Sequence, residues 1–217
     1  MVKIYISADM EGVTGVTHPQ DVIPGRQQYE RFREFLTADV NAAIEGASQE
    51  GATEFVVNEA HDGMRNILIE DLDPRAELIV GSRKPLSMMQ GFEGSEVVFL
   101  VGYHARAGTG GIMSHTYEVP TVITGVGLNG EPCSEARMNA TLAGVRGIPV
   151  GLVTGDDLTC AEARSLYAGV RTARVMFFPQ LERVDDRHVS WTHEDFETAL
   201  KMFIGVLKMS TSDPDYG

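Results

Sequence analysis

The run Glu96-Val-Val-Phe-Leu-Val-Gly102 (EVVFLVG) decides the fold class of this chain. Its apolar residues are continuous rather than alternating, which is typical of a strand that is covered on both faces of a parallel sheet. Two further strands are predicted at 2–8 (VKIYISA) and 53–57 (TEFVV), and the stretch 29–47 between them has apolar residues at helical spacing, before Gly51. Strands that alternate with helices indicate an α/β protein with a mostly parallel sheet and helices on both faces.

The rest of the chain continues this pattern. A short strand is predicted at 77–80 and a buried strand at 148–154. Asn129-Gly130 supplies the positive φ values of a two-residue turn and predicts a hairpin between 121–128 and the residues after the turn. Three helix starts are predicted: an N-cap at Ser134, a capping box from Thr159 to Glu162, and a looser box from Thr192 to Asp195 that opens a last helix through Leu207.

Composition excludes several classes of protein. The 217 residues are 43% hydrophobic, enough for one large domain or one domain with an appendage. The formal net charge of -13 argues against a surface for phosphate backbones, so nucleic acid is not an expected partner. No apolar run reaches the ~20 residues of a membrane helix and no signal peptide is evident, so we expect a cytoplasmic protein without a membrane partner. Cys133 and Cys160 lack CxxC spacing and are expected to be small buried residues.

Side chains that can bind metal ions follow three of the predicted strands. Asp9 and Glu11 follow the first strand, His61 the second and His104 the third. The carboxyl ends of parallel strands meet at one edge of a sheet, so these residues are expected to converge there. Each residue alone has a plainer explanation, as a solvated carboxylate or a hydrogen-bonded histidine. Because three separate strands end in such residues at the same edge, a metal site is favoured over these plainer explanations.

Glu135, in the first turn of a predicted helix, is a fifth candidate ligand, although a glutamate there also gains from the helix dipole. Carboxylates and imidazoles without sulfur indicate zinc or manganese in a catalytic site. Because a mononuclear catalytic zinc takes three protein ligands, five candidates indicate two metals that share one carboxylate. His115 lies beyond a glycine-rich loop that can carry it over this site, which favours an acid/base or nucleophilic role. The sequence therefore indicates a metallohydrolase.

Three further sites have two interpretations each. Lys84 and Arg106 are candidates for substrate contact, although a solvated charge is the more frequent outcome. The pair Asp156-Asp157 follows the predicted strand 148–154. These two carboxylates either orient a ligand or merely decorate the loop between strand and helix, and we favour an orienting or structural role.

Taken together, these motifs resemble the M55 family of metallopeptidases, whose characterised type is a D-aminopeptidase. The resemblance runs in order from about Val2 to about Ala173 and is specific, because several spaced motifs agree. The motifs that carry it are SADMEG, VNEAHDGMRN, GYHARAG, GIMSH, the Glu135 helix with Asn139, and TGDD.

The resemblance implies a set of roles for the candidate residues. His115 matches the histidine that is proposed to be catalytic in the family. Five residues match the ligands of two zinc ions, with Asp9 as the bridge, Glu11 and His61 on one ion, and His104 and Glu135 on the other.

The function that this resemblance implies is that of a zinc-dependent aminopeptidase, which hydrolyses N-terminal residues, D-amino acids among them, from short peptides. It also suggests a ring-like homo-oligomer. Two alternatives stay open. One is a dinuclear metal amidohydrolase or phosphoesterase with a non-peptide substrate, and the other is an inactive, metal-stabilised assembly subunit.

The C-terminal part departs from the family. We expect an α/β metal-binding catalytic domain over 1–173 and a reduced, small α+β part over 174–217. At Arg174-Val175-Met176 the chain passes directly to a segment that resembles the C-terminal end of the family, without the strands and helices that intervene there. Either this is a natural deletion or a stretch of chain is omitted from this sequence. The junction has no Gly, Asn or Asp for a direct turn, which favours an omitted stretch.

Overall fold

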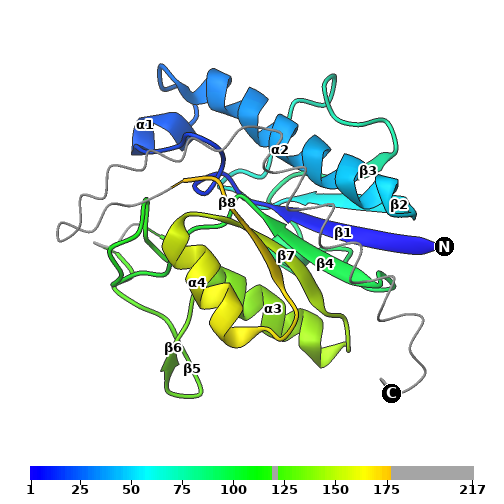
Figure 1. Ribbon diagram of the computed structural model, residues 1–217. Coiled ribbons are helices and arrows are strands. Elements are labelled where there is room, and N and C mark those ends of the chain that lie inside the picture. The colour runs from blue at the N-terminus through cyan, green and yellow to red at the C-terminus, as the bar shows by residue number, and fades with distance from the viewer. Residues whose placement is uncertain (119–121, 177–217) are drawn as a thin grey trace, which may run out of the picture.

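A six-stranded, wholly parallel sheet forms the centre of the molecule (Figure 1). The computed structural model describes residues 1–118 and 122–176. In spatial order the strands are β3 (Ala76–Ile79), β2 (Ala52–Glu59), β1 (Val2–Ala8), β4 (Val97–Val101), β7 (Val150–Gly155) and β8 (Arg171–Arg174). The predicted α/β class and the mostly parallel sheet are confirmed. No helix in the described ranges is long and apolar enough to cross a membrane.

Helices cover both faces of the sheet. In Figure 1, α2 (Tyr29–Gln49) lies above the sheet, and α3 (Glu135–Val145) and α4 (Asp157–Leu166) lie below it. The core between α2 and the sheet includes Phe99 of β4, whereas the core between α3 and the sheet includes Val98 and Leu100. Because β4 is buried on both faces, its sequence is apolar at every position.

Three short elements complete the described fold. Helix α1 (Pro19–Val22) leads into α2, and the 3-10 helix η1 (Ser87–Met89) lies between β3 and β4. The predicted hairpin is present, with φ values of 54° at Asn129 and 85° at Gly130. Its strands, β5 (Gly127–Leu128) and β6 (Glu131–Pro132), are two residues each and therefore shorter than predicted.

One predicted helix start is wrong. The capping box from Thr159 to Glu162 is not formed, because α4 already begins at Asp157. The side chain of Asp156, directly after β7, accepts a hydrogen bond from the Thr159 amide and is the N-cap. By contrast, the N-cap at Ser134 is confirmed. The predicted helix from Thr192 lies outside the described residues.

The residues at the predicted junction continue the sheet. The Val175 amide donates to the Gly155 carbonyl over 3.0 Å, and Met176 is buried in the core beside α2. The division between a catalytic domain and a reduced C-terminal part at residue 173 stays a prediction.

Strand order places the candidate ligands side by side. The order of the sheet reverses between β1 and β4, and such a switch point leaves a crevice at the carboxyl ends of the strands. The turns that follow β1 and β4 pack backbone against backbone there. The Gly12 amide donates to the Gly102 carbonyl over 2.8 Å, and a Cβ at Gly12 would lie 1.8 Å from the Tyr103 carbonyl oxygen. Glycine at this position therefore allows the two turns to meet.

Candidate metal centre

The predicted ligands converge at the carboxyl ends of β1, β2 and β4. Three groups of side chains each offer ligand atoms that lie within 4.8 Å of one another. The first is Asp9, Glu11 and His61, the second Asp9, His104 and Glu135, and the third Glu11, His104 and His115. All are buried except His115, which is partly exposed. The structure thus brings together the five predicted metal ligands and the predicted catalytic histidine.

Asp9 and Glu11 reach the site from a turn rather than from the strand. Strand β1 ends at Ala8, before both residues, so the period-two alternation of an extended strand does not orient these side chains. The Asp9 amide donates to the Val101 carbonyl of β4. At the other end of the turn, the Gly12 amide donates to the Gly102 carbonyl. The turn, and not strand periodicity, therefore gives the two carboxylates a common direction.

In the first group, one nitrogen of His61 faces two carboxylates. The other, Nε2, lies 2.9 Å from the Val22 carbonyl oxygen, which can only accept, so Nε2 carries the hydrogen. This leaves Nδ1 to face Glu11 Oε2 at 3.0 Å and Asp9 Oδ1 at 3.5 Å. A backbone carbonyl that fixes the tautomer of a histidine in this way is typical of metal ligands.

The second group contains two buried atoms without a hydrogen-bond partner. His104 Nδ1 donates to the Ala105 carbonyl over 3.1 Å, so Nε2 points toward Asp9 Oδ2 at 3.4 Å and Glu135 Oε1 at 3.5 Å. Within residues 1–118 and 122–176, neither His104 Nε2 nor Asp9 Oδ2 has a hydrogen-bond partner. Buried polar atoms normally have one, so two unpartnered atoms that face each other fit a cation between them. The hard and borderline donors present suit zinc.

Without a metal, protons compensate the charge of this cluster. Burial alone would raise the pKa of Asp9, but the neighbouring imidazoles of His104 and His61 outweigh it and hold that pKa well below its usual range. Burial would lower the pKa values of His61 and His104, yet the neighbouring carboxylates raise both well above the ordinary value. Each imidazole therefore holds a proton where a metal ion would otherwise bind.

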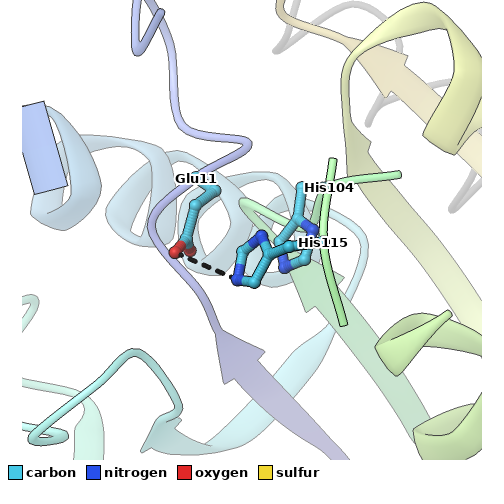
Figure 2. Close-up of side chains that lie close together, drawn as sticks. All are labelled: Glu11, His104 and His115. Carbon is cyan, nitrogen blue, oxygen red and sulfur yellow. Dashed lines mark ion pairs between the residues drawn. The ribbon is translucent and has the colours of Figure 1, made fainter. Parts of the chain in front are cut away.

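His115 lies over the second group, on the loop between β4 and β5. Its ring stacks on that of His104, with centroids 3.9 Å apart and an angle of 6° between the planes. Nδ1 lies 2.7 Å from the Met113 carbonyl oxygen and donates to it, so Nε2 is the nitrogen left to face other groups. Figure 2 shows this nitrogen directed toward Glu11, whose Oε1 lies 3.6 Å away.

The family model of the D-aminopeptidases, peptidase family M55, matches residues 2–176 of this chain. The chain belongs to the M55 family. A D-aminopeptidase of Bacillus subtilis (strain 168) is 40% identical over 178 residues, which are 80% of this chain and 63% of the relative. The chain thus spans less than two thirds of that relative's length.

A solved structure supports the same relationship. The Zn-dependent D-aminopeptidase DppA from Bacillus subtilis, described as a self-compartmentalizing protease, is similar with a TM-score of 0.84 and 34% sequence identity. The match covers 97% of this chain and 75% of that chain. The fold of this M55 chain is therefore that of DppA.

Glu59, at the end of β2, holds the turn that carries His61, and this role was not predicted. Its buried carboxylate accepts hydrogen bonds from the His61 amide over 3.0 Å and from the side chain of Asn66 over 2.9 and 3.0 Å. Asn66 Nδ2 also donates to the His61 carbonyl over 2.8 Å. An acidic residue at the end of a strand, after the apolar run Phe55-Val56-Val57 and two positions before a candidate ligand, is the signal that could have identified it.

A cavity of about 540 Å³ opens in front of the cluster. Metal-ligand candidates line one side, and the apolar part of the lining includes Met64, Met88 and Met113. Lys84 and Arg106, the predicted candidates for substrate contact, are not among its lining residues. Lys84 Nζ instead donates to Asn58 Oδ1 over 2.7 Å, and burial lowers its pKa to about 8.

Proposed function

We propose that this chain is a zinc-dependent aminopeptidase that releases N-terminal D-amino acids from short peptides. The observation that carries the proposal is the position of Asp9, whose two carboxylate oxygens face two different groups of ligand atoms in one buried cluster. Membership of the M55 family supports it, as do the D-aminopeptidase relative and the Zn-dependent enzyme of the same fold.

The proposed ligand set divides around Asp9. Glu11 and His61 would hold one zinc ion together with Asp9, and His104 and Glu135 would hold the other. Bound in this way, the ions supply Lewis acidity that activates water and polarises the scissile carbonyl. Glu135 Oε1 also accepts a hydrogen bond from the Tyr117 amide over 2.6 Å, which fixes its orientation.

His115 is proposed to move the proton. With the hydrogen on Nδ1 engaged by Met113, its Nε2 can accept a proton from the attacking water while the water oxygen bonds to the carbonyl carbon. The same nitrogen then delivers that proton to the leaving amine as the peptide C–N bond breaks. The products are a free amino acid and the shortened peptide.

The cavity suits a short peptide with a free amino terminus. Its volume lies within the roughly 300–1,000 Å³ of small-ligand pockets. Asp62 and Glu118 line it in addition to the ligand candidates, and no lysine or arginine belongs to the lining that the structure describes. Asp62 and Glu118 keep their negative charge when zinc ions offset that of the ligand set, and they can attract a substrate ammonium group.

The proposal extends to assembly and location. We propose that the chain forms a ring-like homo-oligomer in the cytoplasm, and the description of DppA as self-compartmentalizing supports the oligomer. We also propose that residues 1–173 form the catalytic domain and that residues 174–217 form a reduced C-terminal part.

Activity assays with matched substrates test the function. Zinc-loaded protein is incubated with free-amine peptides that begin with a D- or an L-residue, with their N-acetylated forms, and with amides and phosphate esters. We expect release of the N-terminal D-residue and no cleavage of the acetylated peptides. Turnover of amides or phosphate esters alone would support the non-peptide alternative. Bound zinc without any turnover would support an inactive assembly subunit.

A further inference from the structure

The carboxylate of Asp156 joins two parts of the molecule. Asp156 is 1% exposed and lies between the end of β7 and the first turn of α4. Its Oδ1 accepts from the Thr159 amide over 2.8 Å and from the Thr159 hydroxyl over 2.6 Å. Its Oδ2 accepts from the Ile112 amide over 2.8 Å. An N-cap needs only one carboxylate oxygen, so the second oxygen is available to hold the loop that contains Ile112.

The loop lies close against Asp156 at Gly111, where there is no room for a side chain. A Cβ added at Gly111 would lie 2.6 Å from Asp156 Oδ2, 2.7 Å from the Ala105 Cβ and 2.9 Å from Ser114 Oγ. Any side chain at this position would push the loop away from the carboxylate. Gly111 therefore allows the loop to come close to Asp156, and the charge-assisted hydrogen bond from the Ile112 amide holds it there.

From this anchor the chain runs directly to His115. Met113 adopts a left-handed φ of 54°, and its carbonyl accepts the hydrogen of His115 Nδ1. The His115 amide donates to the Ala105 carbonyl over 3.2 Å. These contacts place the ring on His104 and direct Nε2 toward the cavity. The anchored residue, Ile112, is three positions before His115, so little chain is left between them to absorb a displacement.

We propose that Asp156 is a positioning residue for His115: through Oδ2 it fixes the loop that sets the distance of His115 Nε2 from the reacting atoms. The inference rests on the proposed function, because His115 is the proposed proton carrier. Asp156 is neither one of the candidate ligands nor one of the residues that line the cavity. A residue of this kind acts on the rate of the chemical step more than on substrate or metal binding.

The variant Asp156→Ser separates the two roles of the carboxylate. Serine is itself a good N-cap, so it can still accept from the Thr159 amide, but it has no second oxygen for Ile112. Since a misplacement of about 1 Å can cost on the order of 100-fold in rate, we expect kcat to fall roughly 10- to 100-fold with KM and zinc content near the parent values. Thr159→Val is the matched control: it removes a donor to Oδ1, leaves the bond to Ile112, and should keep the parent kcat.

A second readout does not depend on turnover. Diethyl pyrocarbonate acylates accessible imidazoles, and peptide mapping by mass spectrometry reports the rate at each histidine. In metal-free and zinc-loaded protein, Asp156→Ser should make His115 react several-fold faster, while the Thr159→Val control should react at the parent rate. If the parent protein cleaves no peptide, the proposed function fails, yet this measurement still tests the positioning of His115.

Gly111→Ala disturbs the same contact between the loop and Asp156 by a change in the loop. It is the alternative variant if Asp156→Ser does not fold. It leaves the cap of α4 in place and displaces the loop, so it should likewise lower kcat and speed modification of His115. Parent values of kcat and of the His115 modification rate in either folded variant would overturn the proposal and leave Asp156 as a helix cap alone.

Discussion

His104 and His115 stack on each other, and both donate from Nδ1 to a backbone carbonyl. Both rings therefore present Nε2 to carboxylates, but in different surroundings. The side chain of His104 is 1% exposed and faces Asp9 and Glu135 inside the cluster, whereas that of His115 is 16% exposed and lines the cavity. A buried nitrogen among carboxylates suits a metal ligand, and an accessible nitrogen with a fixed tautomer suits proton transfer.

The substitution His115→Ala tests this division. We expect the variant to keep its zinc and its fold and to lose roughly 10²- to 10⁴-fold in kcat, because a group that moves a proton in the transition state does not hold the ion. Zinc analysis, circular dichroism and steady-state kinetics on the same preparation measure the three quantities. Turnover at the parent rate would show that His115 is not catalytic.

At the residue scale, the sequence predicted correctly that the candidate ligands would lie close together. Asp9, His61 and His104 could be placed because each follows a strand, and parallel strands present their carboxyl ends at one edge. Glu59 and the second oxygen of Asp156 could not be placed in the same way. Their roles depend on turns that fold back over the sheet, so a local pattern can mark Glu59 as unusual but does not specify which groups either carboxylate holds.

At the scale of elements, the site depends on how closely the turns after β1 and β4 approach each other. Gly102 has a φ of 73°, and a Cβ there would lie 2.2 Å from the Asp9 carbonyl oxygen and 2.9 Å from a methyl group of Val13. Both the backbone conformation and the lack of space require glycine. The contact fixes the backbone of Asp9 relative to the strand that delivers His104.

The pair Gly102→Ala and Gly94→Ala separates these two requirements. Gly94 also has a positive φ, of 80°, but has nothing within 4 Å of an added Cβ. Gly94→Ala should therefore cost only the backbone strain, about 1 kcal/mol or slightly more, in the free energy of unfolding. Gly102→Ala should cost clearly more and also weaken zinc binding. Equal losses in urea denaturation would contradict the role assigned to the close approach.

The ranges of helices and strands were predicted well where the spacing of apolar residues defines them. Strand β1 matches its predicted range, and α2 extends the predicted one by two residues to Gln49. The start of α4 was predicted too late because Asp156 and Thr159 are both residue types that favour an N-cap, and the capping-box pattern at Thr159 was preferred. The turn signal at Asn129-Gly130 gives the position of the hairpin, but it does not specify the length of its strands.

At the scale of the whole molecule, the buried charges link stability to pH. The pKa values of His61 and His104 in the folded, metal-free protein are raised, so their stabilising contribution is fully present below about pH 6.5, the ordinary histidine value, and is lost as the pH rises through the raised values. The free energy of unfolding of metal-free protein should therefore fall as the pH rises from about 6.5 into the alkaline range.

Zinc should reverse this trend, because the ion displaces the imidazole protons and binds more tightly at higher pH. Urea denaturation with and without zinc across this pH range measures both trends. A His104→Gln variant lacks one of the two titrating groups and should show a smaller fall without metal. A metal-free protein whose stability rises steadily over this range would contradict the charge assignment.

The junction at Arg174-Val175-Met176 also belongs to this scale. Because the residues at the join lack a turn signal, we predict that a stretch of chain is omitted from this sequence. Intact mass spectrometry of the protein from its natural source should give a mass clearly above the 23.7 kDa of these 217 residues. A mass near 23.7 kDa would establish a true deletion, which should leave the metal site intact and weaken peptide binding more than zinc binding.

The central claim, a two-zinc site bridged by Asp9, is tested most directly by the zinc content of the parent protein and of Asp9→Ala. The parent should bind about two zinc ions per chain, since five ligands exceed the three of a mononuclear catalytic site. Removal of the bridge should abolish both ions, whereas Glu135→Ala, which removes a ligand from one side only, should retain about one ion. A single zinc ion in the parent, or full zinc content in Asp9→Ala, would contradict the account.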